Sequence, residues 1–222
     1  MHLVIISGAT RPEPISNTAK IIEAFRLGFE EQGNTTEKYF LSDRKQWAAA
    51  FQATEKNENI LFAIPLYVEN IPGSMLEFLQ EVTPKTDGKT RMAFLLQGGF
   101  DEACQLRCCE EFLKTLPRKL GCDYAGTLIK GGMFGIRFVN EQMQSKMTEP
   151  YIEMGRVFAK KGTFTTQEVR DFAGPEYMTR GSVISFALFG KIFMRLFMTK
   201  LLHSQGDKKA SLTAKPYAGN LK

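Results

Sequence analysis

Five apolar runs of strand length recur within the first 131 residues of the chain. Each is short, rich in branched and aromatic residues, and bounded by turn-forming residues, which is the pattern of a buried β-strand. The runs are HLVIIS at 2–7, TEKYFL at 36–41, ENILFAIP at 58–65, RMAFLLQ at 91–97 and YAGTLIKG at 124–131. The sequence therefore predicts five strands.

The stretches between these runs carry the spacing of amphipathic helices. In the first of them Ile21, Phe25 and Phe29 recur every four residues, charged residues occupy the other side, and Gly33 ends the pattern. Further helical patterns cover 73–82, 102–121 and 141–162, and Pro150 is expected to kink or interrupt the last. Strands joined through helices pair in parallel by right-handed crossovers, so helices cover both faces of the sheet. The expected fold is a doubly wound α/β sheet.

The loop after the first strand, SGATRPEPISNT, is longer than the usual connection of about 2–6 residues. Ligands of open parallel sheets collect where the winding reverses, which for strand order 2-1-3-4-5 lies between the first and third strands. This loop brings hydroxyl groups and Arg11 to a helix N-terminus, where an anion is favoured. Ser16 or Asn17 has an alternative role as the helix N-cap, which needs no ligand. The loop is a candidate phosphate site.

The loops after the third and fourth strands border the same crevice. Pro65, Leu66 and Tyr67 end one strand, and a ring beside rigid prolines suits a flat ligand, although a lone aromatic there is often part of the core. Gly98 and Gly99 follow the next strand, and they allow either a close approach of backbone amides to a ligand or a tight turn.

Other ligand chemistries are disfavoured by what the sequence lacks. No G-K-[ST] follows the first loop and no G-x-G-x-x-G occurs there, which argues against ATP and Rossmann-type NAD binding. The four cysteines, Cys104, Cys108, Cys109 and Cys122, form no C-x-x-C pair, and the two histidines lie near the chain ends. Reduced structural thiols are expected rather than a metal site.

The loop ending SNT, the stretch IPLYVENIPGSMLEFLQEV and the segment LLQGGF together resemble the NAD(P)H-dependent FMN reductase family of flavodoxin-like proteins. The likeness covers about residues 1–135 and implies a flavodoxin-like five-stranded parallel sheet of order 2-1-3-4-5 that binds FMN. The residues that it implies around the FMN phosphate are Ser7, Thr10, Arg11, Ser16, Asn17 and Thr18. Those that it implies along the flavin ring are Pro65, Leu66, Tyr67, Val68 and Asn70 on one side, and Gln97, Gly98, Gly99 and Phe100 on the other.

The resemblance implies an FMN-dependent oxidoreductase that passes hydride from NADH or NADPH through bound FMN to a small acceptor: a flavin, quinone, azo compound or metal complex. Because FMN supplies the chemistry, no catalytic side chain is expected. The alternative is an FMN-binding electron-transfer module without reductase turnover of its own. No iron–sulfur cluster is expected, since cluster-bearing relatives keep cysteines before the third strand, where this chain has none. Relatives are usually oligomers, so a homo-oligomer with small-molecule partners and no nucleic acid is expected.

Charge divides the chain into two parts. Residues 1–175 carry 21 Lys and Arg against 22 Asp and Glu, whereas residues 176–222 carry 8 against 2, which accounts for the net charge of +5. We therefore expect a flavodoxin-like FMN-binding domain over 1–175 and a basic, apolar helical extension over 176–222. Met1 is followed by a strand pattern rather than a signal peptide, so a cytoplasmic protein is expected.

Within the extension, SVISFALFGKIFMRLFMTKLL at 182–202 predicts a helix that is apolar almost all round. Roughly 20 residues span a bilayer, but Lys191 and Arg195 in the middle would each cost about 3 kcal/mol there, so spanning is not expected. Such a helix must be covered. A second subunit is the first expectation, ahead of an anionic membrane surface and of the flavin crevice closed as a lid.

Overall fold

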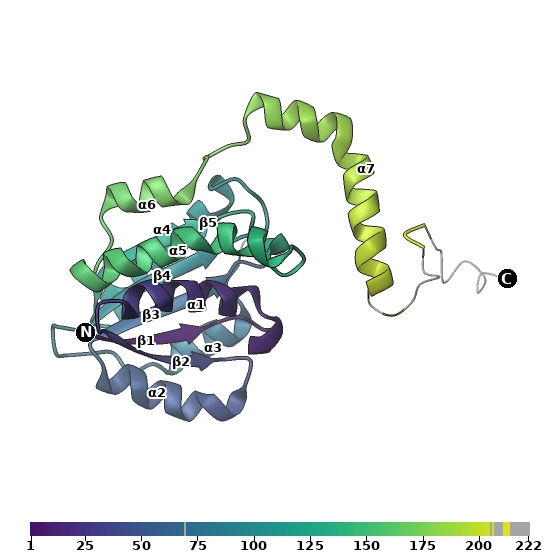
Figure 1. Cartoon of the computed structure of the whole chain (residues 1–222). Coiled ribbons are helices and arrows are strands. Elements are labelled where there is room, and N and C mark those ends of the chain that lie inside the picture. Colours follow the sequence, from purple (N-terminus) through teal and green to yellow (C-terminus); the bar gives the residue numbers. More distant parts are fainter. Residues whose placement is uncertain (69, 205, 207–210, 214–222) are drawn as a thin grey trace. The chain divides into compact units, whose positions relative to one another are not determined.

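The computed structural model describes the chain except for residues 69, 205, 207–210 and 214–222 (Figure 1). The chain divides into two compact units, Met1–Tyr177 and Met178–Lys222. The predicted extension starts at residue 176, and its residues 205, 207–210 and 214–222 lie outside the described part.

A parallel β-sheet forms the centre of the first unit. Its strands are β1 (His2–Ser7), β2 (Thr35–Phe40), β3 (Asn59–Pro65), β4 (Arg91–Gln97) and β5 (Asp123–Lys130). They pair in parallel in the order β2-β1-β3-β4-β5. The predicted strands and their order are confirmed, and each predicted run agrees with its strand to within one residue at either end.

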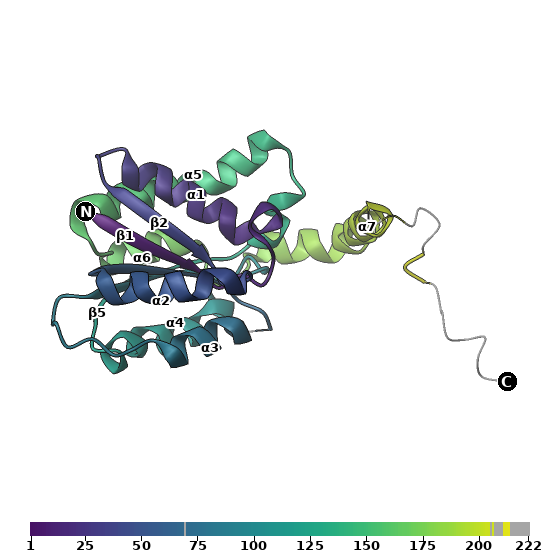
Figure 2. The same cartoon turned by 90° about the horizontal axis from the view of Figure 1, so that it is seen from below.

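Helices cover both faces of this sheet, as Figure 2 shows. The α-helices are α1 (Asn17–Glu30), α2 (Trp47–Lys56), α3 (Gly73–Glu81), α4 (Cys104–Lys119), α5 (Glu141–Lys161), α6 (Thr166–Ala173) and α7 (Arg180–Ser204); short 3-10 turns are η1 (Glu13–Ile15), η2 (Arg44–Gln46) and η3 (Met133–Arg137). Helices α1, α5 and α6 lie on one face, and α2, α3 and α4 lie on the other. Successive strand residues such as Ile5 and Ile6 are therefore both fully buried, on opposite faces, which explains strands that are apolar without alternation.

Helix α5 runs without interruption through Pro150 for 21 residues. The proline removes one backbone donor, but Tyr151, Gly155 and Phe158 beyond it are buried. Packing of that buried side keeps the helix continuous at Pro150, where local helix propensity alone would end it.

Helices α1 and α5 contact each other through two glycines, and they lie side by side in Figures 1 and 2. A Cβ atom at Gly28 would overlap the carbonyl oxygen of Ile152, and one at Gly155 would overlap the carbonyl oxygen of Phe25. The close approach lets Phe158 pack on Phe25 with ring centroids 6.1 Å apart. Because α1 begins at the predicted phosphate loop, this contact helps to fix where that loop lies.

Replacing Gly155 with alanine is expected to lower the free energy of unfolding by about 2 kcal/mol, because a methyl group has no room against the Phe25 carbonyl. The higher helix propensity of alanine, about 1 kcal/mol, offsets only part of the full cost. Gly73→Ala is the matched control, since a Cβ at Gly73 of α3 meets nothing within 4 Å. Urea unfolding of both variants checks this. Equal stability of the two would show that the α1–α5 contact can widen freely.

Candidate functional site

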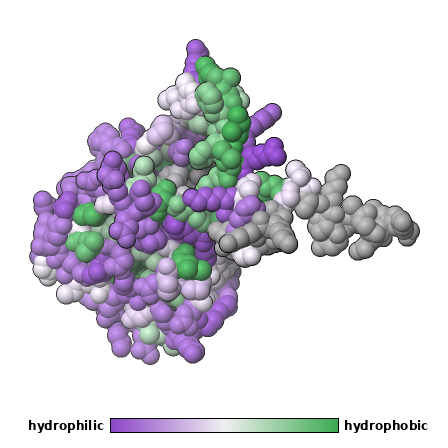
Figure 3. All heavy atoms as spheres, turned by 45° about the vertical axis from the view of Figure 1, so that its right-hand side comes forward, coloured by the Kyte–Doolittle hydropathy of each residue, from purple (hydrophilic) through white to green (hydrophobic). Residues whose placement is uncertain are grey.

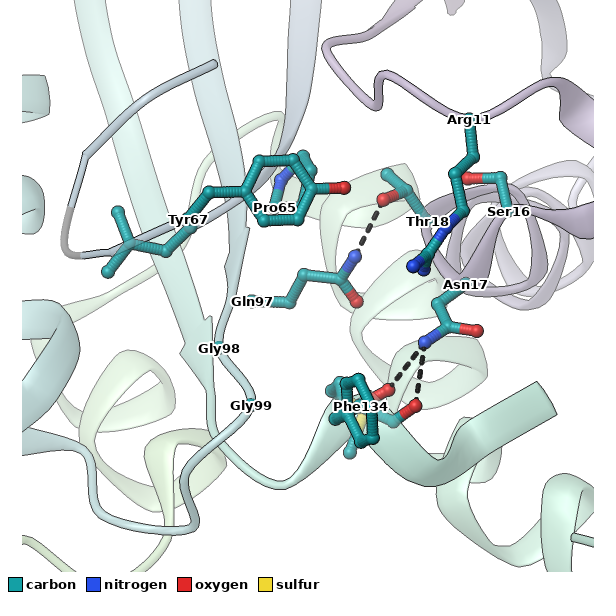
Figure 4. A pocket seen from close by; sticks show the side chains of 12 residues that line it. Arg11, Ser16, Asn17, Thr18, Pro65, Tyr67, Gln97, Gly98, Gly99 and Phe134 are labelled. Carbon is teal, nitrogen blue, oxygen red and sulfur yellow. Dashed lines mark hydrogen bonds between the residues drawn. The ribbon is translucent and has the colours of Figure 1, made fainter. Parts of the chain in front are cut away.

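A solvent-open pocket lies where β1, β3 and β4 end (Figure 4). Its lining comes from four segments: Arg11, Ser16, Asn17 and Thr18; Pro65, Leu66 and Tyr67; Gln97, Gly98 and Gly99; Met133 and Phe134. The enclosed space is about 110 Å³, below the roughly 300–1,000 Å³ of typical ligand pockets. A larger ligand would therefore extend from the pocket into solvent.

The register of the sheet brings these segments together. Pro65 of β3 pairs with Gln97 of β4, and Gln97 pairs in turn with Lys130 of β5. The Leu66 backbone N–H donates to the Gln97 carbonyl at 2.7 Å, which carries the pairing one residue beyond the strand. Three loops therefore leave the sheet at the same level.

The first turn of α1 forms one wall and favours an anion. Ser16 is the N-cap, and its Oγ accepts a hydrogen bond from the Ala19 N–H at 3.3 Å. The backbone N–H groups of Asn17 and Thr18 have no acceptor in the described part of the chain. Figure 4 shows the Arg11 side chain reaching between Thr18 and Asn17. Capping by Ser16 and anion binding are therefore compatible, because they use different donors.

Two side-chain amides tie the walls of the pocket together, as the dashed lines in Figure 4 mark. Asn17 Nδ2 donates to the carbonyls of Met133 at 2.9 Å and Phe134 at 3.0 Å. Gln97 Nε2 donates to Thr18 Oγ1 at 2.6 Å. Asn17 Oδ1 and Gln97 Oε1 are buried and have no partner in that described part. The pocket therefore presents two unsatisfied acceptors, and the Asn17 side chain has no amide hydrogen left for a phosphate.

The loop after β5 supplies a wall that sequence reasoning did not find. Gly132 N–H donates to the Phe100 carbonyl at 2.8 Å, and Met133 N–H donates to the Gly98 carbonyl at 2.9 Å. A Cβ at Gly131 would overlap the Phe100 carbonyl, and Gly132 has φ 71°. These glycines let the two loops join backbone to backbone. Ligands gather at the carboxyl ends of parallel strands, and the segment GGMFGIRF at 131–138 follows the end of β5. Applying that rule to this segment could have indicated Met133 and Phe134.

Five predicted residues do not line the pocket: Ser7, Thr10, Val68, Asn70 and Phe100. Ser7 is fully buried, and its Oγ accepts from the Ala9 N–H at 3.4 Å. Thr10, Asn70 and Phe100 are exposed, and Asn70 Oδ1 accepts from the neighbouring Ile71 N–H.

Val68 lies outside the pocket at a tight turn. Backbone hydrogen bonds between Tyr67 and Asn70 close the turn, and Val68 is 94 % exposed with φ 50°. A positive φ is strained for a β-branched residue. The turn directs Val68 into solvent while the adjacent Tyr67 lines the pocket.

A second arginine adds positive charge near the pocket. Desolvation lowers the pKa of Arg137, and the charge of Arg11 lowers that pKa further. Its guanidinium lies 4.4 Å from the centre of the Phe138 ring, and its Nε is buried without a partner among the described residues. Two guanidinium groups close enough to repel each other would be stabilised by a bound anion.

Among the described residues, no group of three or more His, Cys, Asp or Glu side chains could hold a metal ion. All four cysteines are free thiols: Cys108 is exposed, and Cys109 and Cys122 are buried. Burial raises the pKa of Cys109 to about 12 and the pKa of Cys122 to about 11.

A thiol reagent at about pH 8 is expected to modify Cys108 rapidly and to reach Cys109 and Cys122 only after unfolding, because buried thiols with raised pKa values form almost no thiolate. Timed labelling followed by peptide mass spectrometry checks this, with urea-unfolded protein as the control. Labelling of Cys109 as fast in the folded as in the unfolded protein would contradict the burial.

Comparison with known proteins gives likeness in structure only. No known family model and no curated protein matches the sequence. An NAD(P)H:quinone oxidoreductase from Methanothermobacter marburgensis is 15% identical with a TM-score of 0.54, over 72% of this chain and 98% of that one. An FMN-dependent NADH-azoreductase from Bacillus anthracis, solved in complex with FMN, is 13% identical with a TM-score of 0.53, over 74% and 100%. A putative quinone reductase from Klebsiella pneumoniae is 12% identical with a TM-score of 0.54, over 81% and 94%. The flavodoxin-like fold is thereby confirmed.

Proposed function

We propose that the chain binds FMN and passes hydride from NADH or NADPH to a small acceptor, of the flavin, quinone, azo or metal-complex class. The observation that carries the proposal is one pocket that combines an anion-favouring helix end, unsatisfied acceptors and two aromatic side chains. Support comes from the fold shared with proteins named as quinone and azo reductases, one of them in complex with FMN.

FMN has a phosphate, a hydroxylated chain and a flat ring, and the pocket offers a match to each. The free N–H groups of Asn17 and Thr18, with the Arg11 guanidinium, suit the phosphate. The orphaned oxygens of Asn17 and Gln97 suit hydroxyl or ring N–H donors. Tyr67 and Phe134 offer apolar faces to the ring, and both remain 40 % or more exposed without it.

Bound FMN would supply the hydride chemistry, and the residues of the chain would bind and orient it. No carboxylate, histidine or cysteine is found among the described residues that line the pocket. The Gly98 N–H already donates to the Lys130 carbonyl at 3.0 Å. The Gly99 N–H has no acceptor in the described structure, so it is the donor available to negative charge at the ring.

The deciding experiment is reconstitution with FMN followed by stopped-flow mixing with NADH and with NADPH. We expect bound FMN and fast bleaching by at least one donor, with turnover when a quinone or azo dye is added. Binding with slow bleaching by both donors would instead support the electron-transfer module. Failure to bind FMN would refute both functions.

Arg11→Ala is expected to weaken FMN binding by about 10- to 100-fold, the usual effect of losing a charged hydrogen bond. Riboflavin lacks the phosphate, so its binding should not change. Fluorescence titration of both ligands measures this, with Arg170→Ala, an exposed arginine of α6 outside the pocket, as the matched control. An equal loss for both flavins would place Arg11 at the ring rather than at the phosphate.

A further inference from the structure

Among the described helices, α7 exposes the largest number of large apolar side chains. Arg180–His203 is long and apolar enough to cross a membrane by length and composition, and only 6% of its most apolar stretch is buried. Figure 3 shows hydrophobic residues gathered along it. Thr179 starts the helix, because its Oγ1 accepts from the Ser182 N–H at 3.2 Å. The helix is continuous over Arg180–Ser204 but bends sharply along its length, as Figures 1 and 2 show, and its apolar side chains are exposed.

One side of α7 carries a phenylalanine ridge, which consists of Phe186, Phe189, Phe193 and Phe197. At about 100° per residue these positions fall on one side of the helix. Gly190 lies among them, and a Cβ there would meet the Phe186 ring at 3.0 Å. The rings of Phe193 and Phe197 stack with centroids 6.2 Å apart. Phe186, Phe189 and Phe193 are 58–65 % exposed.

The side opposite the ridge carries positive charge. Arg180, Lys191 and Arg195 fall there by the same geometry, interspersed with apolar residues such as Leu188. Lys200 is the exception: it falls on the ridge side, near the C-terminal end of the helix. No Asp or Glu occurs from residue 177 to residue 206. The helix therefore brings an apolar ridge and a basic stripe with no acidic residue of its own to neutralise it.

We propose that α7 docks on an anionic lipid bilayer and lies in the plane of its surface. The phenylalanine ridge would enter the acyl region, and the basic stripe would meet the anionic head groups. Long Lys and Arg stems let the charged groups reach outward to the head groups, so apolar residues beside them, such as Leu188, lie at the head-group boundary. This proposal is independent of the FMN site.

A second copy of α7 fits these observations less well. Two paired helices would cover one side of each and leave apolar residues such as Ile184 and Leu188, 60 % and 65 % exposed, in water. Neither helix brings an acid to neutralise Lys191 and Arg195. Spanning the bilayer also fits less well, because it would place those two charges near the midplane.

The test uses the full-length chain and flotation with phosphatidylcholine vesicles, with and without phosphatidylserine. We expect binding to the phosphatidylserine vesicles that is lost at high salt. The double variant Lys191→Glu/Arg195→Glu should weaken it by about 30-fold or more, at about fivefold for each cation removed. Lys119→Glu/Lys160→Glu, two exposed lysines of the first unit with the same change in net charge, is the matched control and should bind normally.

A second pair of variants tests the ridge. Phe189→Ser/Phe193→Ser should abolish binding, whereas Phe112→Ser, at an exposed phenylalanine of α4, should not. Circular dichroism verifies that every variant keeps its helices. Equal binding with and without phosphatidylserine would overturn the proposal. An oligomer that does not bind vesicles, and that dissociates when Phe189→Ser/Phe193→Ser is introduced, would also overturn the proposal. It would show instead that α7 contacts a second copy of the chain. Retention after both salt and alkaline washes would show a spanning helix and would overturn the in-plane arrangement.

Discussion

Parallel pairing of β1, β3, β4 and β5 is the constraint on which the site depends. It places the carboxyl ends of four strands at one edge of the sheet. The pairs Pro65–Gln97 and Gln97–Lys130 align the ends of β3, β4 and β5 with one another. Each strand is then followed by a loop at that edge, so residues more than a hundred positions apart, such as Asn17 and Phe134, come within hydrogen-bond distance. A one-residue slip of β4 would turn Gln97 to the opposite face and remove its bond to Thr18.

The position of α1 follows from that sheet and from α5. Helix α1 packs on the sheet, and Gly28 and Gly155 let α5 lie close beside it on the same face. With the helix held in this way, its first turn is fixed at the carboxyl edge. Asn17 then uses both amide hydrogens to hold the η3 loop. The same residue that orders the pocket thus leaves its own oxygen buried and unsatisfied, and a ligand donor can repair that deficit.

Much of the fold and part of the site could be predicted from sequence, for identifiable reasons. The strands are local apolar runs, and the strand order with its carboxyl-end rule directed attention to Arg11 and Tyr67, whereas Gln97 was implied by the family resemblance. The direction of a loop side chain depends on backbone turns that no local pattern fixes. Val68 and Phe100 therefore lie in solvent, although they are close in sequence to residues that line the pocket. Phe134 was missed because its loop is drawn to the site by tertiary hydrogen bonds, from the Asn17 side chain and from the Gly132 and Met133 backbone, that no local sequence pattern indicates.

The two units also differ in how they balance charge. In the first unit, Arg26, Arg107 and Arg156 each contact two glutamates, and Glu110 is buried between Arg107 and Lys114. Those charges are neutralised within the fold, and residues 1–175 are close to neutral as a whole. The helix α7 has cations and no acid from 177 to 206, so its charge can be balanced only from outside that stretch. A partner that is both apolar and anionic would cover the exposed apolar surface and neutralise the charge together, and the surface of an anionic bilayer, which we propose as that partner, is both.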